Sequence, residues 1–309
     1  MKKKLLILIT VITVSFSSAY AWGGGAILGS ESYLSIGTFG GPGALMFSGD
    51  TESPNKIGFA FGFSVDYSCY INKYLGFTTG MHIFRMSSGY KETNISSRGE
   101  GSIRVSDGIS SWYDDARYHI KTGRIDETYK TVFLEVPVML AFQYQKWYWN
   151  MGMKVAVPIS MNCDYTFGNS KLYLDEDLTT GTSFTSPGMF IREYSGSSGT
   201  NDLYDKQRHQ LLVFYVMASL EAGYNVAFYG GSSTLTVGAF VDVSLNGAKL
   251  NSSSESPTIT LDSEELTYNN SLSSGKVNTV TCFKAGIKLQ YNIGIGHGAH
   301  RSTRGLHYL

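Results

Sequence analysis

Apolar and polar residues alternate along eight stretches of this chain. In the clearest stretch the apolar positions are Ile57, Phe59, Phe61, Phe63, Val65 and Tyr67, and the positions between them are Gly58, Ala60, Gly62, Ser64, Asp66 and Ser68. A period of two places successive side chains on opposite faces of a β-strand. The pattern therefore predicts strands with one bulky apolar face and one small or polar face. These strands cover residues 31–40, 55–69, 73–87, 128–144, 147–163, 208–229, 233–248 and 277–293.

The connections between these strands alternate between long and short. Three are tight turns, at residues 70–72, 145–146 and 230–232, and four are long segments rich in Ser, Gly, Thr and Asn, at residues 41–54, 88–127, 164–207 and 249–276. Long strands joined in this way are typical of barrels that cross a membrane. We therefore predict an all-β fold: an eight-stranded antiparallel transmembrane β-barrel, an up-and-down meander with long outer loops and short periplasmic turns. A soluble barrel such as a lipocalin would turn the apolar faces inward, whereas the other face here carries glycines and charges.

The first residues predict export. Lysines at positions 2–4 precede an apolar run over residues 5–14, and Ala19-Tyr20-Ala21 forms a small-x-small cleavage site. This is the pattern of a secretory signal peptide, and the run is too short for a membrane anchor. We predict a signal peptide at 1–21, an outer-membrane barrel domain at 22–293 and a flexible periplasmic tail at 294–309. An even number of strands places both termini in the periplasm of a Gram-negative bacterium.

Composition argues against two other classes of protein, nucleic-acid binders and proteins built on disulfides or zinc. The formal net charge is +0 and 16% of residues are charged, which argues against a nucleic-acid partner, because such proteins carry a basic stripe. Cys69, Cys163 and Cys282 lie far apart without metal-ligand spacing, which argues against a disulfide framework or a zinc site. We expect all three to act as small apolar residues in or near strands.

Aromatic residues gather beside the short turns. Such amphipathic rings favour the headgroup level of a membrane, so we predict a periplasmic aromatic girdle made of Tyr70, Tyr74, Tyr144, Trp147, Tyr148, Trp149, Phe228, Tyr229 and Tyr291.

Residues 131–140, Thr-Val-Phe-Leu-Glu-Val-Pro-Val-Met-Leu, followed by Trp-Asn-Met-Gly-Met-Lys at 149–154, resemble the central hairpin of the PorT-like outer-membrane β-barrel family of Bacteroidetes. That family carries a Leu-Glu-Ile-Pro signature, and Val136 replaces the isoleucine here. Residues 74–80 resemble the strand before the family's first large loop. Relatives end on an aromatic residue at the last strand, whereas the tail at 294–309 follows here. The resemblance implies an outer-membrane location, insertion by the barrel-assembly machinery and association with a secretion apparatus.

Charged residues on the predicted inner face form a belt. Its members are Asp66, His82, Glu135, Lys154, Glu221, Asp242, Lys284 and Lys288. Most lie roughly seven to ten residues from the short turns, close to mid-membrane at the rise of a β-strand. Opposite signs are neighbours, with Glu135 beside Lys154, Lys154 beside Glu221, and Asp242 beside Lys284. We predict a salt-bridged core that fills the narrow lumen; the alternative is a proton or ion path.

Catalytic constellations are not evident in the sequence. Asp114, Asp115 and His119 lie close together in the second outer segment, but no second His or Ser/His/Asp set accompanies them. His297, His300 and His307 belong to the predicted tail, where metal binding would be weak. Pro137 and Pro158 lie inside predicted strands, which indicates a bulge or a local break in pairing.

We therefore expect no catalytic, cofactor or metal site. The expected function is that of a non-enzymatic outer-membrane barrel that displays large loops for structural or partner-interaction roles. The alternative is a narrow transporter or channel, or a secretion-associated component. The expected partners are outer-membrane lipid, the barrel-assembly machinery during biogenesis and a protein at the outer loops, with no nucleic acid.

Overall fold

The computed structural model describes residues 31–49, 56–72, 74–106, 111–177, 182–183, 189–194, 196–202, 214–227, 233–249, 259–262, 265–268, 272 and 277–295. The predicted signal peptide and nearly all of the predicted tail lie outside these residues. Eight strands form the barrel: β1 Glu31–Gly49, β2 Gly58–Tyr70, β3 Leu75–Ser106, β4 Ser111–Tyr144, β5 Trp147–Phe167, β10 Tyr215–Ala227, β11 Ser233–Ser244 and β15 Val277–Gly294. The shorter strands are β6 Ser170–Asp177, β7 Thr182–Ser183, β8 Met189–Tyr194, β9 Ser198–Asp202, β12 Ala248–Lys249, β13 Ile259–Asp262 and β14 Glu265–Tyr268.

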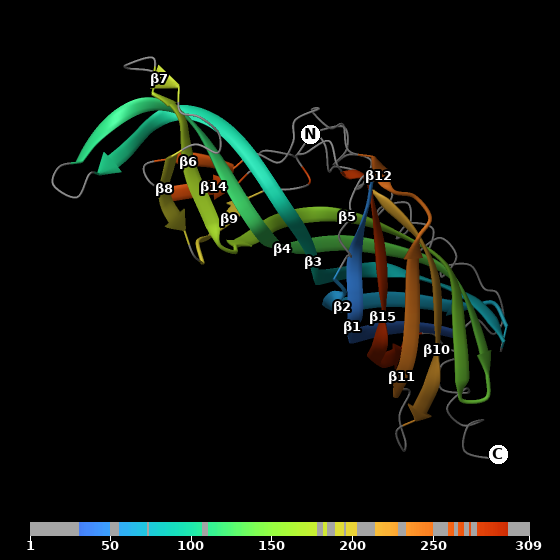
Figure 1. Ribbon diagram of the computed structural model, residues 1–309. Coiled ribbons are helices and arrows are strands. Elements are labelled where there is room, and N and C mark those ends of the chain that lie inside the picture. Colours follow the sequence, from blue (N-terminus) through green and yellow to red (C-terminus); the bar gives the residue numbers. More distant parts are fainter. Residues whose placement is uncertain are drawn as a thin grey trace, which may run out of the picture.

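The eight long strands close into a ring (Figure 1). The neighbours are β1–β2–β3–β4–β5–β10–β11–β15 and back to β1, and every pairing is antiparallel. The ring leaves no open edge, so backbone groups of all eight strands find partners within the barrel. The predicted eight-stranded antiparallel barrel is confirmed.

Short connections lie at one end of the barrel, called the turn end below. Gln145 and Lys146 join β4 to β5, and Gln145 has a φ of 53°, as a tight hairpin requires. Between β2 and β3, the side-chain oxygen of Asn72 accepts hydrogen bonds from the backbone N–H groups of Tyr74 and Leu75. The third predicted turn, at 230–232, lies outside the described residues.

Two outer segments predicted as loops are largely β-structure. β3 and β4 pair from Leu75 opposite Phe142 to Ser106 opposite Ser111, so the loop predicted at 88–127 is instead the outer half of a long hairpin. The segment predicted at 164–207 contains the end of β5 and strands β6 to β9. The many polar residues of both segments mask these strands in the sequence, where the apolar positions that they bury are sparse.

The other boundaries move by smaller amounts. β1 continues nine residues beyond the predicted end at 40, into the segment predicted as the first outer loop. The last predicted outer segment, 249–276, contains the β13–β14 hairpin. Residues 208–213 and 228–229 of the sixth predicted strand lie outside the described residues.

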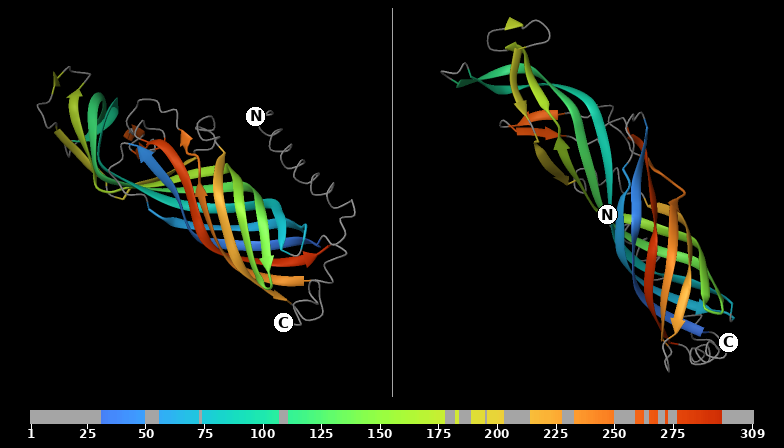
Figure 2. Two further views of the ribbon diagram at one scale, coloured as in Figure 1. Left: turned by 90° about the vertical axis from the view of Figure 1, so that its right-hand side faces the viewer. Right: turned by 60° about the horizontal axis from the view of Figure 1, so that its bottom comes forward.

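The outer ends of β3 and β4 leave the barrel and, with β6 to β9, β13 and β14, form a second body that we call the distal lobe (Figure 2). Asn94, with a φ of 55°, has no partner in the β3–β4 pairing and faces Gly123. At this break in pairing the buried face of β3 changes from Tyr90 and Glu92 to Ile95 and Ser97, while the register of the two strands stays the same. The lobe has its own apolar core, made of Ile95, Tyr118, Ile120, Ile125, Tyr165, Phe167, Leu172, Leu174, Ile259, Leu266 and Tyr268.

Pro137 and Pro158, the two prolines predicted to lie inside strands, both interrupt regular pairing, as does Pro42 on β1, where the β1–β15 pairing skips from Gly40 to Gly43. The β3–β4 pairing skips from Thr79 opposite Val138 to His82 opposite Glu135, and Pro137 lies in that gap. Pro158 borders a bulge in the β4–β5 pairing, where Val132 faces Ser160 and the next residue of β4 faces Pro158. Proline has no N–H to donate, so these irregularities fall where a donor is missing. No helix in the described part of the chain is long and apolar enough to cross a membrane.

Candidate functional site: the barrel lumen

The outer surface of the barrel carries large apolar side chains on all eight strands. We call this set the apolar belt; its members are between 43% and 66% exposed, and they are Ile36, Phe59, Phe61, Phe63, Val65, Met81, Ile83, Val138, Leu140, Met151, Met153, Leu220, Val237, Val241, Val243, Ile287 and Leu289. The alternation of each strand then turns the intervening residues into the lumen.

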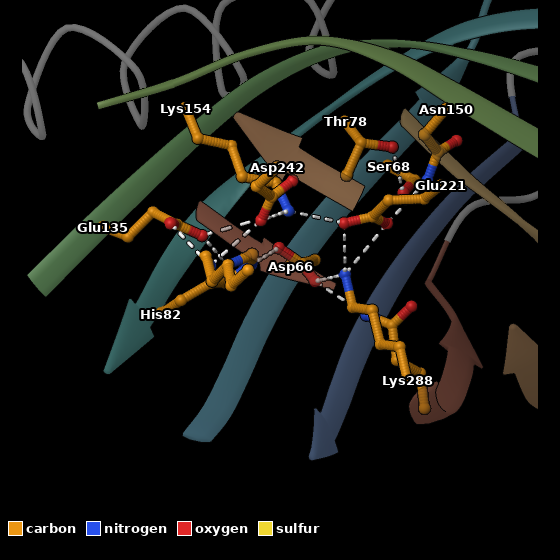
Figure 3. Close-up of polar contacts among 12 residues, drawn as sticks. Asp66, Ser68, Thr78, His82, Glu135, Asn150, Lys154, Glu221, Asp242 and Lys288 are labelled. Carbon is orange, nitrogen blue, oxygen red and sulfur yellow. Dashed lines mark hydrogen bonds and ion pairs between the residues drawn. The ribbon is translucent and has the colours of Figure 1, made fainter. Parts of the chain in front are cut away.

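All eight residues of the predicted charged belt lie in the lumen at one level and are at most 4% exposed. We call this group the charge layer (Figure 3). It draws on seven of the eight barrel strands, with two lysines from β15, while β1 contributes the ring of Phe39. Because these residues are far apart in sequence, only closure of the barrel brings them together.

Lys154 lies between three carboxylates. Its Nζ is 2.8 Å from Oε1 of Glu221, 3.0 Å from Oδ2 of Asp242 and 3.9 Å from Oε1 of Glu135. All three predicted neighbour pairs occur, since Lys284 also reaches Oδ2 of Asp242 at 3.0 Å.

The two lysines of β15 complete the ion pairs. Lys284 contacts Oε2 of Glu135 at 2.7 Å, and its Nζ lies 4.1 Å from the centroid of the Phe84 ring. Lys288 contacts Oδ2 of Asp66 at 3.1 Å and Oε2 of Glu221 at 3.1 Å. Ring faces attract such cations once they are removed from water.

His82 bridges two carboxylates. Its Nδ1 lies 2.8 Å from Oε1 of Glu135, and its Nε2 lies 2.8 Å from Oδ1 of Asp66. Ionised carboxylates only accept hydrogen bonds and a neutral imidazole has a single N–H, so these two contacts require one further proton. With that proton, four carboxylates face three ammonium groups and one additional positive charge, and the layer is neutral.

Apolar side chains fill the lumen on the lobe side of the charge layer. We call them the apolar plug; its inward members include Phe39, Leu45, Phe84, Met86, Phe133, Tyr215, Met217 and Phe240. The rings of Phe84 and Phe133 stack at 4.9 Å. The sequence prediction missed this plug because it assigned small or polar residues to the inner face. The signal is present in β4, where 132–134 and 138–142 are apolar on both faces, a pattern of strands buried on both sides.

On the turn side of the charge layer lies a polar chamber. Its volume is about 50 Å³, and its lining includes Asp66, Lys288, Gln290, Asn225 and Thr236. The Oη of Tyr148 and the Oδ1 of Asn150 are buried there without a hydrogen-bond partner in the described part of the chain. About four waters fit a space of this size, and they would satisfy such atoms. Gly223 and Gly238 make room for the Tyr148 ring, because a Cβ at Gly238 would lie 2.1 Å from its Oη.

The predicted aromatic girdle divides into two groups. Outward-facing and exposed at the turn end are Tyr74, Tyr144, Trp147, Trp149 and Tyr291. The prediction is wrong for Tyr70 and Tyr148, which are buried inside the barrel; Tyr70 packs edge-on against Tyr33 at 6.1 Å. Phe228 and Tyr229 lie outside the described residues.

The acid and histidine candidates of the second outer segment lie in the distal lobe. Nδ1 of His119 is 2.5 Å from Oδ1 of Asp175, and its ring stacks on Tyr173 at 4.8 Å. The side chains of Asp114 and Asp115, and the tail histidines, lie outside the described part of the structure. Within the described residues, no group of three or more His, Cys, Asp or Glu side chains is arranged to hold a metal ion. Cys69, Cys163 and Cys282 are buried and unpaired.

Neither a protein family model nor a curated protein matches this chain. Among solved structures, the chain is similar to Ail, the attachment invasion locus protein of Yersinia pestis in complex with the heparin analogue sucrose octasulfate, at 9% identity over 85% of this chain and 99% of that chain, with a TM-score of 0.28. It is also similar to the translocator domain of the autotransporter NalP from Neisseria meningitidis, at 7% identity over 94% and 97%, with a TM-score of 0.21. At such scores these likenesses carry no argument about this chain.

Proposed function

We propose that this chain is an integral outer-membrane β-barrel that neither conducts nor catalyses, and that it presents its distal lobe as an interaction platform outside the cell. One observation carries the proposal: a closed ring of eight strands has an apolar belt around its outside and a filled lumen inside. A soluble barrel would place its apolar side chains in the reverse arrangement.

The height of the belt supports membrane residence. Along β3, Arg85 lies ten residues beyond Leu75, and Ile83 is the last exposed apolar residue before it. At about 3.3 Å per residue and a strand tilt near 40°, the segment from Leu75 to Arg85 spans about 25 Å along the barrel axis. The apolar band of outer-membrane barrels has this height. The exposed tyrosines and tryptophans at the turn end suit the headgroup level of the membrane on the periplasmic side.

The contents of the lumen support the absence of conduction. The charge layer and the apolar plug lie in series across the barrel, and every ion of the layer has a partner of opposite charge. A general pore needs a continuous polar path, whereas the polar chamber ends at the charge layer. A narrow transporter is therefore the less supported candidate.

The lobe supports a role outside the membrane. A separate apolar core makes it a folded body rather than a set of closing loops, and Phe190 on β8 is half-exposed against Tyr173. In the described part of the chain His119 contacts Asp175 and Tyr173, and we propose that it helps to hold the lobe together. We further propose that the partner belongs to a secretion apparatus of Bacteroidetes, and the support for this is the PorT-like resemblance at Leu134–Pro137.

The test uses the full mature chain refolded into lipid vesicles. We expect the barrel to float with the vesicles. We also expect no steady conductance in planar bilayers, because the charge layer and the apolar plug both obstruct the lumen. A matched Lys146→Ala variant, changed at an exposed turn, should behave in the same way. Failure to float would contradict membrane residence, and stable ion-selective conductance of the wild type would support the transporter instead.

A further inference from the structure

Above the apolar belt, one side of the barrel carries a cluster of cations. We call it the basic patch: Lys56 before β2, Arg85 and Lys91 on β3, and Arg124 and Lys130 on β4. The strand alternation turns these side chains outward, because the residues between them, such as Met86, Tyr90 and Tyr129, are buried inside. Strand pairing brings the cluster together: Lys130 faces Ser87, Asp126 faces Lys91, and Lys56 bridges to Gly89.

Two carboxylates lie within the patch, and both are already engaged. Lys56 Nζ contacts Asp126 at 2.7 Å, and Arg124 contacts it at 2.5 Å. Lys130 forms an ion pair with Asp164. The hydrogen bond from Arg124 lowers the pKa of Asp126, and the hydrogen bond from Lys130 lowers the pKa of Asp164, so both remain ionised. Five cations less two carboxylates leave three positive charges among the described side chains.

The position of the patch specifies what it can contact. Arg85 follows Ile83 on the outward face, and Val132 lies between Leu134 and Lys130. The cations therefore begin where the belt ends, at the level of lipid headgroups on the lobe side. The opposite wall differs, because the outward side chains described on β10, just after β11 and on β15 at this height, such as Val216, Leu245 and Thr281, are uncharged.

From this arrangement we propose that the basic patch binds the phosphate groups of a phosphorylated glycolipid of the lipid A type in the outer leaflet, while the belt below it contacts the acyl chains. The proposal rests on the outer-membrane residence proposed above. Each basic side chain near an anionic lipid surface contributes roughly a fivefold gain in affinity. Recognition is one-sided, since among the described side chains the cations of the patch lie on β3, on β4 and just before β2.

The test compares two lipids and three proteins in neutral detergent with EDTA, which prevents bridging by divalent cations. Bisphosphorylated lipid A and the same lipid without phosphates are titrated against wild type, against Arg85→Gln/Lys91→Gln/Lys130→Gln, and against Arg98→Gln/Lys121→Gln/Lys171→Gln. The last variant removes three exposed cations from the distal lobe as a matched control. Arg85→Gln alone serves as a milder variant if the triple change impairs folding.

We expect wild type and the lobe control to prefer the bisphosphorylated lipid by about tenfold or more, and the patch variant to lose most of that preference. Inorganic phosphate should not displace the lipid. Equal binding of both lipids, an unchanged preference in the patch variant, an equal loss in the lobe control, or displacement by free phosphate would each overturn the proposal. Vesicle flotation of the same proteins reports separately on membrane residence, so a protein that floats without lipid preference contradicts only this inference.

Discussion

Lys154 illustrates how the interior of the barrel accommodates charge. Its ammonium group is buried and lies within 4 Å of Glu221, Asp242 and Glu135. Removing ions from water costs several kcal/mol each, and the cost is offset only by close partners of opposite sign. Because each carboxylate here also contacts a second cation or His82, the layer is a network rather than a set of isolated pairs.

Replacing Lys154 by methionine should lower the free energy of unfolding by about 3–5 kcal/mol, since it leaves buried carboxylates short of a partner. Urea titration in lipid vesicles, followed by tryptophan fluorescence, measures this change. Lys146→Met at the exposed turn should change stability by less than about 0.5 kcal/mol. A similar small effect for Lys154→Met would mean that the charge layer is not paired as described.

At the scale of elements, the β3–β4 hairpin has two different environments. Up to the break in pairing at Asn94 and Gly123 it is a barrel wall, and beyond the break it belongs to the distal lobe. The β13–β14 hairpin closes the lobe core with Leu266 and Tyr268, and Tyr268 contacts the rings of Tyr165 and Phe167 at 5.6 Å and 6.0 Å. The two bodies therefore have separate apolar cores on shared strands.

Separate cores predict separate responses to mutation. Leu266→Ala/Tyr268→Ala should loosen the lobe by removing buried contacts and leave the barrel intact. Hydrogen–deuterium exchange should increase in residues 95–122 and stay unchanged in 75–90. Thr260→Ala on the exposed side of the same hairpin serves as the control. Increased exchange throughout β3 would instead indicate that barrel and lobe unfold as one unit.

The whole molecule combines a closed cylinder with a body at one end. The proposed orientation in the membrane rests on the difference between the two ends of the cylinder, because the lobe lies at one end and the short turns at the other (Figure 2). The buried cysteines allow this arrangement to be tested with introduced thiols, since none of the three is accessible to a reagent.

Gly123→Cys in the lobe should react with a membrane-impermeant maleimide on intact cells, because this position is exposed and open space surrounds it. Lys146→Cys at the turn end should react only after the outer membrane is permeabilised. Labelling is measured by mass shift on a gel, with the wild type as the unreactive control. Reaction of both variants on intact cells, or of Lys146→Cys alone, would contradict the proposed orientation.

Because the charge layer and the apolar plug obstruct the lumen one after the other, they predict how lumen variants conduct ions. One double variant, Phe84→Ala/Phe133→Ala, removes part of the apolar plug, and another, Lys154→Ala/Glu221→Ala, removes part of the charge layer. Neither double variant should give a steady current in planar bilayers, because the other obstruction remains. The fourfold variant should conduct ions, because both obstructions are then reduced. Conductance in either double variant equal to that of the fourfold variant would show that one seal alone closes the lumen.

Sequence alone determined the ring of eight strands and the members of the charge layer. The period of two fixes which residues share a face of a strand, and counting from the turns fixes their level, so Glu135, Lys154 and Glu221 could be grouped before any contact was known. The same reasoning failed for Tyr70 and Tyr148, because a residue beside a turn can face either the lipid side or the lumen.

Tertiary structure alone decided what occupies the two ends of the lumen and the space above the barrel. The apolar plug arises because a ring of eight strands is narrow enough for side chains from facing walls to meet. Phe39 meets Phe240 in this way although the two residues are 201 positions apart in the sequence. The short lobe strands are rich in polar residues, and β6 and β9 are extended where they pair with β4 and β5. Local periodicity reports one face of one strand, whereas these features depend on which strands become neighbours.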